Sequence, residues 1–173
     1  MTISMYSASI PVFTTMLGNL AHIVRKGQAF VEARKIEPGA ILGYRLAPDM
    51  LPFTRQIQIA CDAAKNGIAR ISGVEAPKFE DSEASFDELN QRIQNTIAWL
   101  ESVPADKLNG TEEKDITFPV GRDKTRTMKA EAYLKHWAMA NASFHTVMAY
   151  AVLRHNGVEL GKADYLVGAN ANA

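Results

Sequence analysis

The chain has 173 residues, of which 47% are hydrophobic and 22% are charged, enough apolar material to bury the core of a single domain. Nineteen basic and nineteen acidic residues give a formal net charge of zero, which argues against a nucleic-acid-binding protein and against attachment to an anionic membrane surface. The single cysteine, Cys61, excludes an internal disulfide and fits a reducing compartment.

The first 24 residues contain no Lys, Arg, Asp or Glu, so a signal peptide or membrane anchor has to be considered. No positive charge precedes the apolar residues, and Ser, Thr, Asn and Pro interrupt them too often for a membrane span. We therefore expect this segment to be part of the folded domain of a cytoplasmic protein, with no membrane as partner.

A first helix is expected from about residue 6 or 11 to residue 35. Ile10, Leu17, Val24 and Val31 recur every seven residues, which is typical of the apolar face of a bundle helix. His22 falls nearly opposite this face, so we expect its ring to lie in solvent.

Residues 37–49 break the helical pattern with Pro38-Gly39, Gly43 and Pro48, leaving room for one helical turn over residues 40–44. Long loops often carry functional residues, so Tyr44, Arg45 and Asp49 are candidates for lining a pocket. Alternatively, Asp49 caps the next helix.

A second helix is expected over residues 50–72. Its apolar stripe includes Ile57 and Ile71, whereas Ile59 and Ala63 lie on the opposite side, a pattern typical of a central helix or of one at a subunit interface. Between these two sides we expect a solvated row of ion-pairing residues: Arg55, Gln58, Asp62 and Lys65.

Residues 73–82 form a linker, and a third helix over residues 86–103 is announced by Ser85 and Glu88 at capping-box spacing. Trp99 lies off the apolar stripe of this helix and is expected to cover a loop or meet a partner. Residues 110–128 then alternate in polarity about a turn at Gly121, which predicts a small β-hairpin that must lie on the helices.

A long helix is expected over residues 127–157, with Thr127 as its N-cap and Asn156-Gly157 as its end. Asn141 interrupts its apolar stripe, so the amide is either satisfied by a neighbouring helix or faces a wet pocket. An extended arm follows, and residues 169–173 are expected to be disordered. The predicted buried stripe comprises Leu134, Trp137, Asn141, Phe144, Met148 and Ala151.

Three of the four histidines lie in this last helix, but none are spaced i and i+4 as a helical metal site requires. His136 and His145 are nine residues apart and point to opposite sides, so they are not expected to share a ligand. We expect structural roles for these histidines, hydrogen-bonded or capping the helix C-terminus, and a functional role stays open only for His145. Cys61 sits in a core pattern, and the sequence contains no nucleophilic serine motif, phosphate loop or dinucleotide fingerprint.

Three runs carry a resemblance to a known family: residues 45–50 (RLAPDM), 55–65 (RQIQIACDAAK) and 153–166 (LRHNGVELGKADYL). Together they resemble a bacterial family of uncharacterised proteins that is grouped with the DinB and YfiT-like four-helix bundles, over residues 5 to about 168. The resemblance implies an all-α, up-down-down-up four-helix bundle with a small hairpin between the third and fourth helices. It also implies one domain, residues 1–168, and a homodimer.

Better-known relatives bind a divalent metal through one His of the second helix and an H-x-x-x-H motif on a later helix, and some are thiol-dependent transferases or isomerases. This chain has no His in residues 37–71, and Asn141 stands where the paired motif needs its first His. We therefore expect no cofactor and an incomplete three-histidine site. The expected function is binding of a small molecule between the second and last helices, with these pocket candidates: Asp49, Arg55, Gln56, Asn141 and His145.

The alternative is an enzyme, a transferase or isomerase that depends on a thiol or on a divalent metal such as Zn or Ni. In that reading, His145 is kept as a ligand and oxygen donors of Asp49, Gln56 or Asn141 replace the missing histidines.

Overall fold

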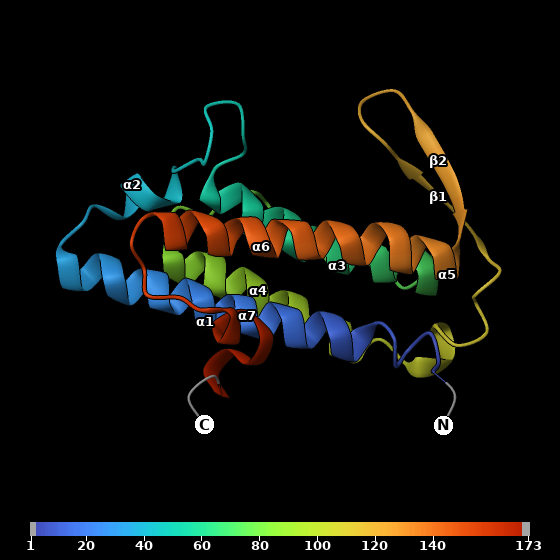
Figure 1. Cartoon of the computed structure of the whole chain (residues 1–173). Coiled ribbons are helices and arrows are strands. Elements are labelled where there is room, and N and C mark those ends of the chain that lie inside the picture. Colours follow the sequence, from blue (N-terminus) through green and yellow to red (C-terminus); the bar gives the residue numbers. More distant parts are fainter. Residues whose placement is uncertain (1–2, 171–173) are drawn as a thin grey trace.

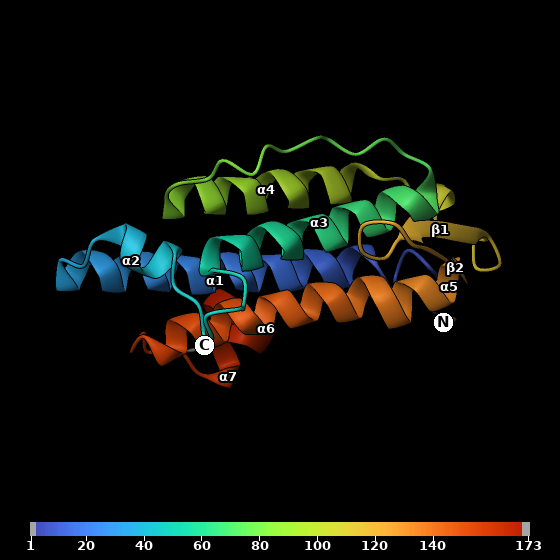
Figure 2. The same ribbon diagram turned by 90° about the horizontal axis from the view of Figure 1, so that it is seen from above.

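The computed structural model describes residues 3–170, and four long helices form its core. These are α1 (Ile10–Arg34), α3 (Phe53–Ser72), α4 (Phe86–Ser102) and α6 (Met139–His155). Helices α1 and α6 run in one direction and α3 and α4 in the other (Figures 1 and 2). This up-down-down-up bundle with its late hairpin confirms the predicted fold class.

The connection from α1 to α3 contains one short helix, α2 (Pro38–Leu42). Helix α3 begins at Phe53, three residues later than predicted, because Pro52 holds the N-cap position in an extended conformation. Asp49 is exposed and does not cap α3.

Helices α3 and α4 run in the same direction, so their connection, residues 73–85, returns along the length of the bundle (Figure 2). The predicted capping box starts α4: the N–H of Glu88 donates to the Ser85 hydroxyl, and the Glu88 carboxylate accepts from the Ser85 N–H. The Trp99 indole donates to the Glu75 carbonyl at 3.2 Å, so this ring covers the connection, one of its two predicted roles.

After the turn η1 (Ala105–Lys107), strands β1 (Asp115–Pro119) and β2 (Thr125–Lys129) form an antiparallel hairpin that projects from one end of the bundle (Figure 1). Phe118 anchors it, with ring centroids 4.7 Å from Tyr133 and 4.9 Å from Trp137. Such a hairpin depends on this apolar contact, because two strands alone are marginally stable.

The last long helix begins at Ala130, because the predicted N-cap Thr127 belongs to strand β2 and pairs with Thr117. It starts as α5 (Ala130–Tyr133) and continues through a π-helical turn, η2 (Leu134–Ala138), into α6. In this turn the N–H of Met139 bonds to the carbonyl of Leu134, five residues back. A π-helical turn therefore inserts one extra residue into the helix.

The extra residue makes the predicted buried stripe of α6 wrong. Each inward position after Leu134 comes about one residue later than a regular 3.6-residue repeat predicts, and Phe144 is 54% exposed. Asn141 is half-buried beside the inward row. The sequence placed this amide on the apolar stripe because the predicted stripe was displaced by about one residue. The inward row comprises Leu134, Ala138, Ala142, Thr146, Ala149 and Leu153.

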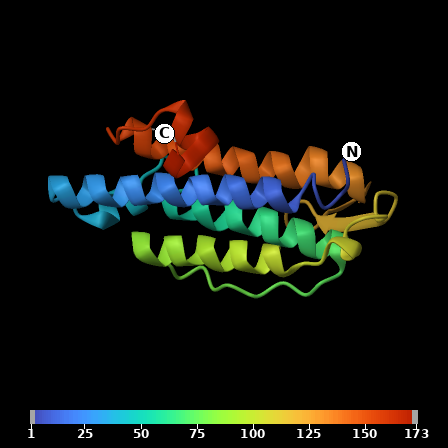
Figure 3. The same ribbon diagram turned by 90° about the horizontal axis from the view of Figure 1, so that it is seen from below.

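The C-terminal arm also differs from its prediction as an extended segment. It contains helix α7 (Lys162–Val167), which packs on α1 (Figure 3), followed by the turn η3 (Gly168–Asn170). Of the tail predicted to be disordered, residues 169–170 belong to this turn and residues 171–173 lie outside the described residues. None of the helices in residues 3–170 combines the length and apolar character needed to cross a bilayer.

Helix α3 approaches the π-helical turn closely at Gly67, where an added Cβ would lie 2.9 Å from the Cβ of Ala138. Such a separation forces backbone to move, because neither group can rotate away. A glycine is therefore required where these two helices touch.

We predict that Gly67→Ala lowers the free energy of unfolding by about 1–3 kcal/mol, since overpacking must shift α3 away from Ala138. Gly18→Ala is the matched control: a Cβ at this α1 position meets nothing within 4 Å, so it should leave stability unchanged or raise it by about 0.5–1 kcal/mol. Urea denaturation followed by circular dichroism measures both, and equal effects would contradict the close approach.

Candidate functional site

Two of the predicted pocket residues are joined by a hydrogen bond between α3 and α6. Gln56 is 2% exposed, and its amide Nε2 donates to the carbonyl of Leu51 at 2.9 Å. Its Oε1 atom is therefore the acceptor for His145 Nδ1, 2.7 Å away. This arrangement puts the proton of the neutral ring on Nδ1 and leaves Nε2 with a free lone pair.

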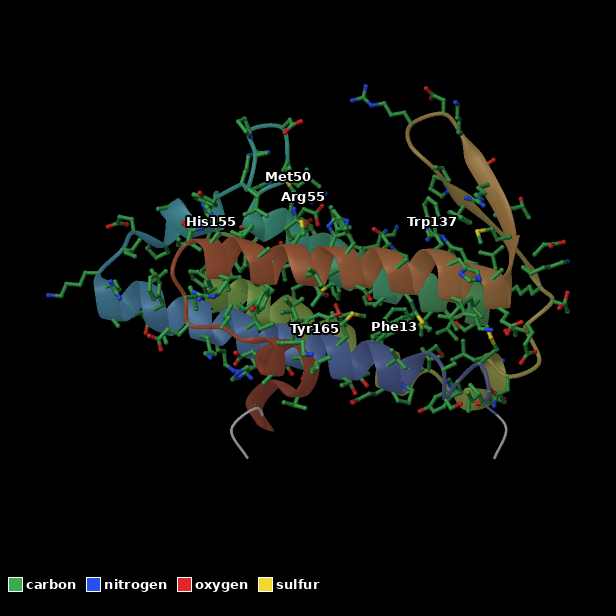
Figure 4. All side chains as sticks on the ribbon, viewed as in Figure 1. Phe13, Met50, Arg55, Trp137, His155 and Tyr165 are labelled. Carbon is green, nitrogen blue, oxygen red and sulfur yellow. The ribbon has the colours of Figure 1, made fainter. Side chains whose placement is uncertain are left out.

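The surroundings of His145 favour the neutral ring. Burial lowers the pKa of His145, and the positive charge of Arg55 lowers it further. Arg55 bonds to Gln58 at 2.7 Å and to Asp81, and Figure 4 shows it beside Met50, where the α2–α3 loop meets α3. At neutral pH the His145 ring, bonded to Gln56, can accept a proton or a hydrogen bond at Nε2 but cannot donate a hydrogen bond from that atom.

The remaining predicted candidates do not complete this pair. Asp49 is exposed on the α2–α3 loop, and Asn141 lies one helical turn before His145. The other two loop candidates make structural contacts. Arg45 donates to the carbonyl of Met50 within the loop, and Tyr44 lies against the ring of His155 at the end of α6, 5.7 Å between centroids.

The donors around His145 do not fit the three-histidine metal centre that the resemblance implies. Gln56 stands on the second long helix and Asn141 precedes His145, so two neutral amides accompany one imidazole. Within residues 3–170, no three His, Cys, Asp or Glu side chains are grouped closely enough to hold a metal ion. Amide oxygens are weak ligands for Zn or Ni, and we derive no step through a metal.

A groove of about 490 Å³ lies between α1, α6 and α7, on the side of α6 opposite His145. None of the predicted candidates lines it. Its wall is mostly apolar and carries no charged side chain. In Figure 4, Tyr165 lies where α7 meets α1. The groove is lined by Pro11, Val12, Thr15, Met16, Asn19, Met139, Ser143, Tyr165 and Leu166.

Helix α7 forms one wall of this groove because a buried carboxylate holds it on α1. Asp164 accepts from Lys26 at 3.0 Å and from the Gly161 N–H at 2.7 Å, and lies 2.9 Å from Nε2 of His22. Partial burial acts to raise the pKa of Asp164, but these hydrogen bonds outweigh it and lower the pKa to about 2. The expectation that His22 lies free in solvent was wrong, because its partner belongs to an element 142 residues away.

The polar row on α3 is only in part the solvated surface that the sequence predicted: Asp62 pairs with Lys65 and keeps 33% of its side chain exposed, but Gln58 and Lys65 are buried. The α3–α4 connection covers these two: Lys65 is 5% exposed and donates to the Pro77 carbonyl at 2.9 Å, and Gln58 donates to Glu83 at 2.7 Å. Arg92 of α4, 3% exposed, binds Glu83 at 2.8 Å and Asp62 at 3.1 Å. This ionic cluster around the buried Arg92 fastens the connection to α3 and α4.

Cys61 is fully buried beside this cluster, as its core pattern predicted. Burial raises the pKa of the Cys61 thiol to about 12, so it stays protonated at neutral pH and is not a nucleophile.

Comparison with known proteins gives two findings. The family model described as "Domain of unknown function (DUF1993)" matches residues 5–166. The crystal structure of a DinB family member from Shewanella denitrificans is 39% identical in sequence, with a TM-score of 0.84, and the match covers 93% of this chain and 90% of that chain. No protein of curated function matches the chain.

We predict that Asp164→Asn lowers the free energy of unfolding by about 2 kcal/mol at neutral pH, because the lowered pKa measures how strongly the fold prefers the charged form. Since the folded pKa is depressed, this contribution is complete above the ordinary value of 3.8 and disappears as the pH falls through about 2. Denaturation at several pH values measures it. Asp123→Asn, at the exposed hairpin tip, is the control, and an equal loss in both variants would contradict the role of Asp164.

Proposed function

Because this chain belongs to the DUF1993 family of DinB-like bundles, and its donors do not suit a three-histidine centre, we propose that it binds a small uncharged molecule. The observation that carries this proposal is the groove between α1, α6 and α7. Its volume of about 490 Å³ falls in the range of small-molecule sites, which are concave and mostly apolar with a few polar groups.

The lining suggests the chemical class of the ligand. Met16, Met139 and Leu166 offer apolar and adaptable contacts, whereas Thr15 and Ser143 offer hydroxyl groups. With no charged side chain in the wall, an ionic group would lose its hydration without gaining a partner. A neutral amphiphile with a ring or short chain and one or two hydrogen-bonding groups matches this wall.

The fold holds the site ready for such a ligand. The amide of Asn19 donates to the Tyr165 carbonyl at 2.9 Å, and the Asp164 contacts hold the same helix against α1. A preformed wall reduces the entropy that binding would otherwise cost.

We predict that the uncharged dye phenylnaphthylamine binds with one saturable site per chain. Ser143→Phe, which places a ring in the groove, should weaken binding by about tenfold or more, equivalent to roughly 1.4 kcal/mol. Dye fluorescence titration measures this effect.

Ala98→Phe is the matched control, because Ala98 is an exposed helical position on α4 outside the groove, and it should bind the dye like the parent protein. Absence of saturable binding, or equal binding by Ser143→Phe and the parent, would refute the groove as the site.

A second candidate function is thiol-dependent group transfer, and the free Nε2 of His145 favours it. A neutral imidazole with its Nδ1 proton held by Gln56 is arranged to accept a proton from a thiol. The thiolate sulfur would then bond to an electrophilic carbon, whose leaving group departs with its electron pair.

We predict for this candidate that the protein accelerates conjugation of mercaptoethanol with chlorodinitrobenzene, in which a C–S bond forms and chloride leaves. Loss of the general base in His145→Ala should reduce the catalysed rate by about a hundredfold or more. His136→Ala, an exposed position, is the control. No acceleration by the parent protein removes this candidate and leaves the groove proposal untouched.

A further inference from the structure

The wall of the groove between α1, α6 and α7 contains an acceptor that has no hydrogen bond. Asn19 of α1 lines the groove and is only 9% exposed. Its amide Nδ2 donates to the Tyr165 carbonyl at 2.9 Å, which fixes the orientation of the carboxamide group. Within residues 3–170 the other polar atom, Oδ1, accepts no hydrogen bond, yet it is not closed off from solvent. Such an atom needs a donor from outside the protein.

Gly168 leaves one side of this acceptor uncovered. An added Cβ at Gly168 would lie only 2.4 Å from Asn19 Oδ1, and the φ angle of +59° also disfavours any other residue. A side chain at this position would therefore press on the oxygen. The chain has a glycine where α7 ends beside Oδ1, and the acceptor stays open.

The other polar groups of the groove can adapt to a ligand, whereas Asn19 Oδ1 cannot. Ser143 Oγ donates to the sulfur of Met16 at 3.6 Å, a weak acceptor that a ligand can replace. The hydroxyl groups of Thr15 and Tyr165 can rotate to donate or to accept. The carbonyl oxygen of an amide only accepts, so Oδ1 decides which polar group the ligand must have.

We propose that the groove selects a neutral ring compound with a hydroxyl group, such as a phenol, whose O–H donates to Asn19 Oδ1. This inference rests on the proposed function, because it assigns the ligand class of the same groove. Met16 lies one helical turn from Asn19, and Met139 faces it from α6, so a ring bonded to Oδ1 would meet two thioethers. An ether of the same ring would cover Oδ1 and supply no proton, which leaves the acceptor without water or partner.

The uncharged pair naphthol and methoxynaphthalene tests this selection, because the two rings differ only in the proton of the hydroxyl group. Equilibrium dialysis of each compound at neutral pH, where a phenol stays protonated, measures its affinity directly. Naphthol should bind the parent protein about tenfold or more tightly than the ether, although the ether is the more apolar compound.

Asn19→Leu keeps the size of the side chain and removes the acceptor, so the preference for naphthol should disappear or reverse. Asn95→Leu is the matched control, because Asn95 is an exposed residue of α4 outside the groove, and this variant should keep the preference of the parent protein. Circular dichroism melting identifies a variant that fails to fold. The comparison of the two compounds on the parent protein requires no variant.

Three outcomes would overturn the inference. Equal binding of both compounds by the parent protein, weakened in both cases by Ser143→Phe, would leave the groove as a ligand site without the selection. Binding of neither compound would remove the selection, and the proposed function would fall with it only if phenylnaphthylamine also failed to bind. A preference that survives in Asn19→Leu and is lost in Tyr165→Phe would assign the contact to the Tyr165 hydroxyl instead.

Discussion

The π-helical turn between α5 and α6 decides which side of α6 meets which neighbour. One additional residue at Leu134–Ala138 rotates the following helix, so that His145 meets Gln56 of α3 while Ser143 lines the groove with α7. The same rotation leaves Phe144 outside the core. The turn sits beneath the hairpin that packs on Tyr133 and Trp137 and next to Gly67, which admits its backbone. Packing on both sides thus holds a geometry that helix propensity alone does not favour.

The number, order and type of the main elements follow from local patterns in the sequence. Heptad-spaced apolar residues predicted α1, the Ser85–Glu88 spacing predicted the start of α4, and alternation about Gly121 predicted the hairpin. The phase of α6 was not predictable in this way, because a regular repeat contains no signal for one inserted residue. The packing of α7 depends on contacts between Asp164 and α1, and such long-range contacts leave no local pattern.

In the candidate site, too, residue types were predictable from the sequence, whereas contacts between distant segments were not. The sequence indicated Gln56 and His145 individually, through residue type and family resemblance, and the structure joins them in one hydrogen bond. The groove escaped prediction because its walls come from the first and last fifths of the chain, and none of its residues has distinctive chemistry. The burial of the polar row on α3 was not predicted for a related reason. Polar residues at helical spacing indicate a solvated surface unless the segment that covers them is known.

The α3–α4 connection, residues 73–85, bears on how this architecture can evolve. Arg92 binds the end of this segment that precedes α4, through Glu83, and Trp99 covers the end that follows α3, at Glu75. The alignment of α3 with α4 therefore does not depend on the number of residues between these two contacts. Added residues near position 76 would bulge outward at little entropic cost, because loop closure grows only slowly with length. A lineage could therefore graft new modules at this site while its scaffold stays unchanged.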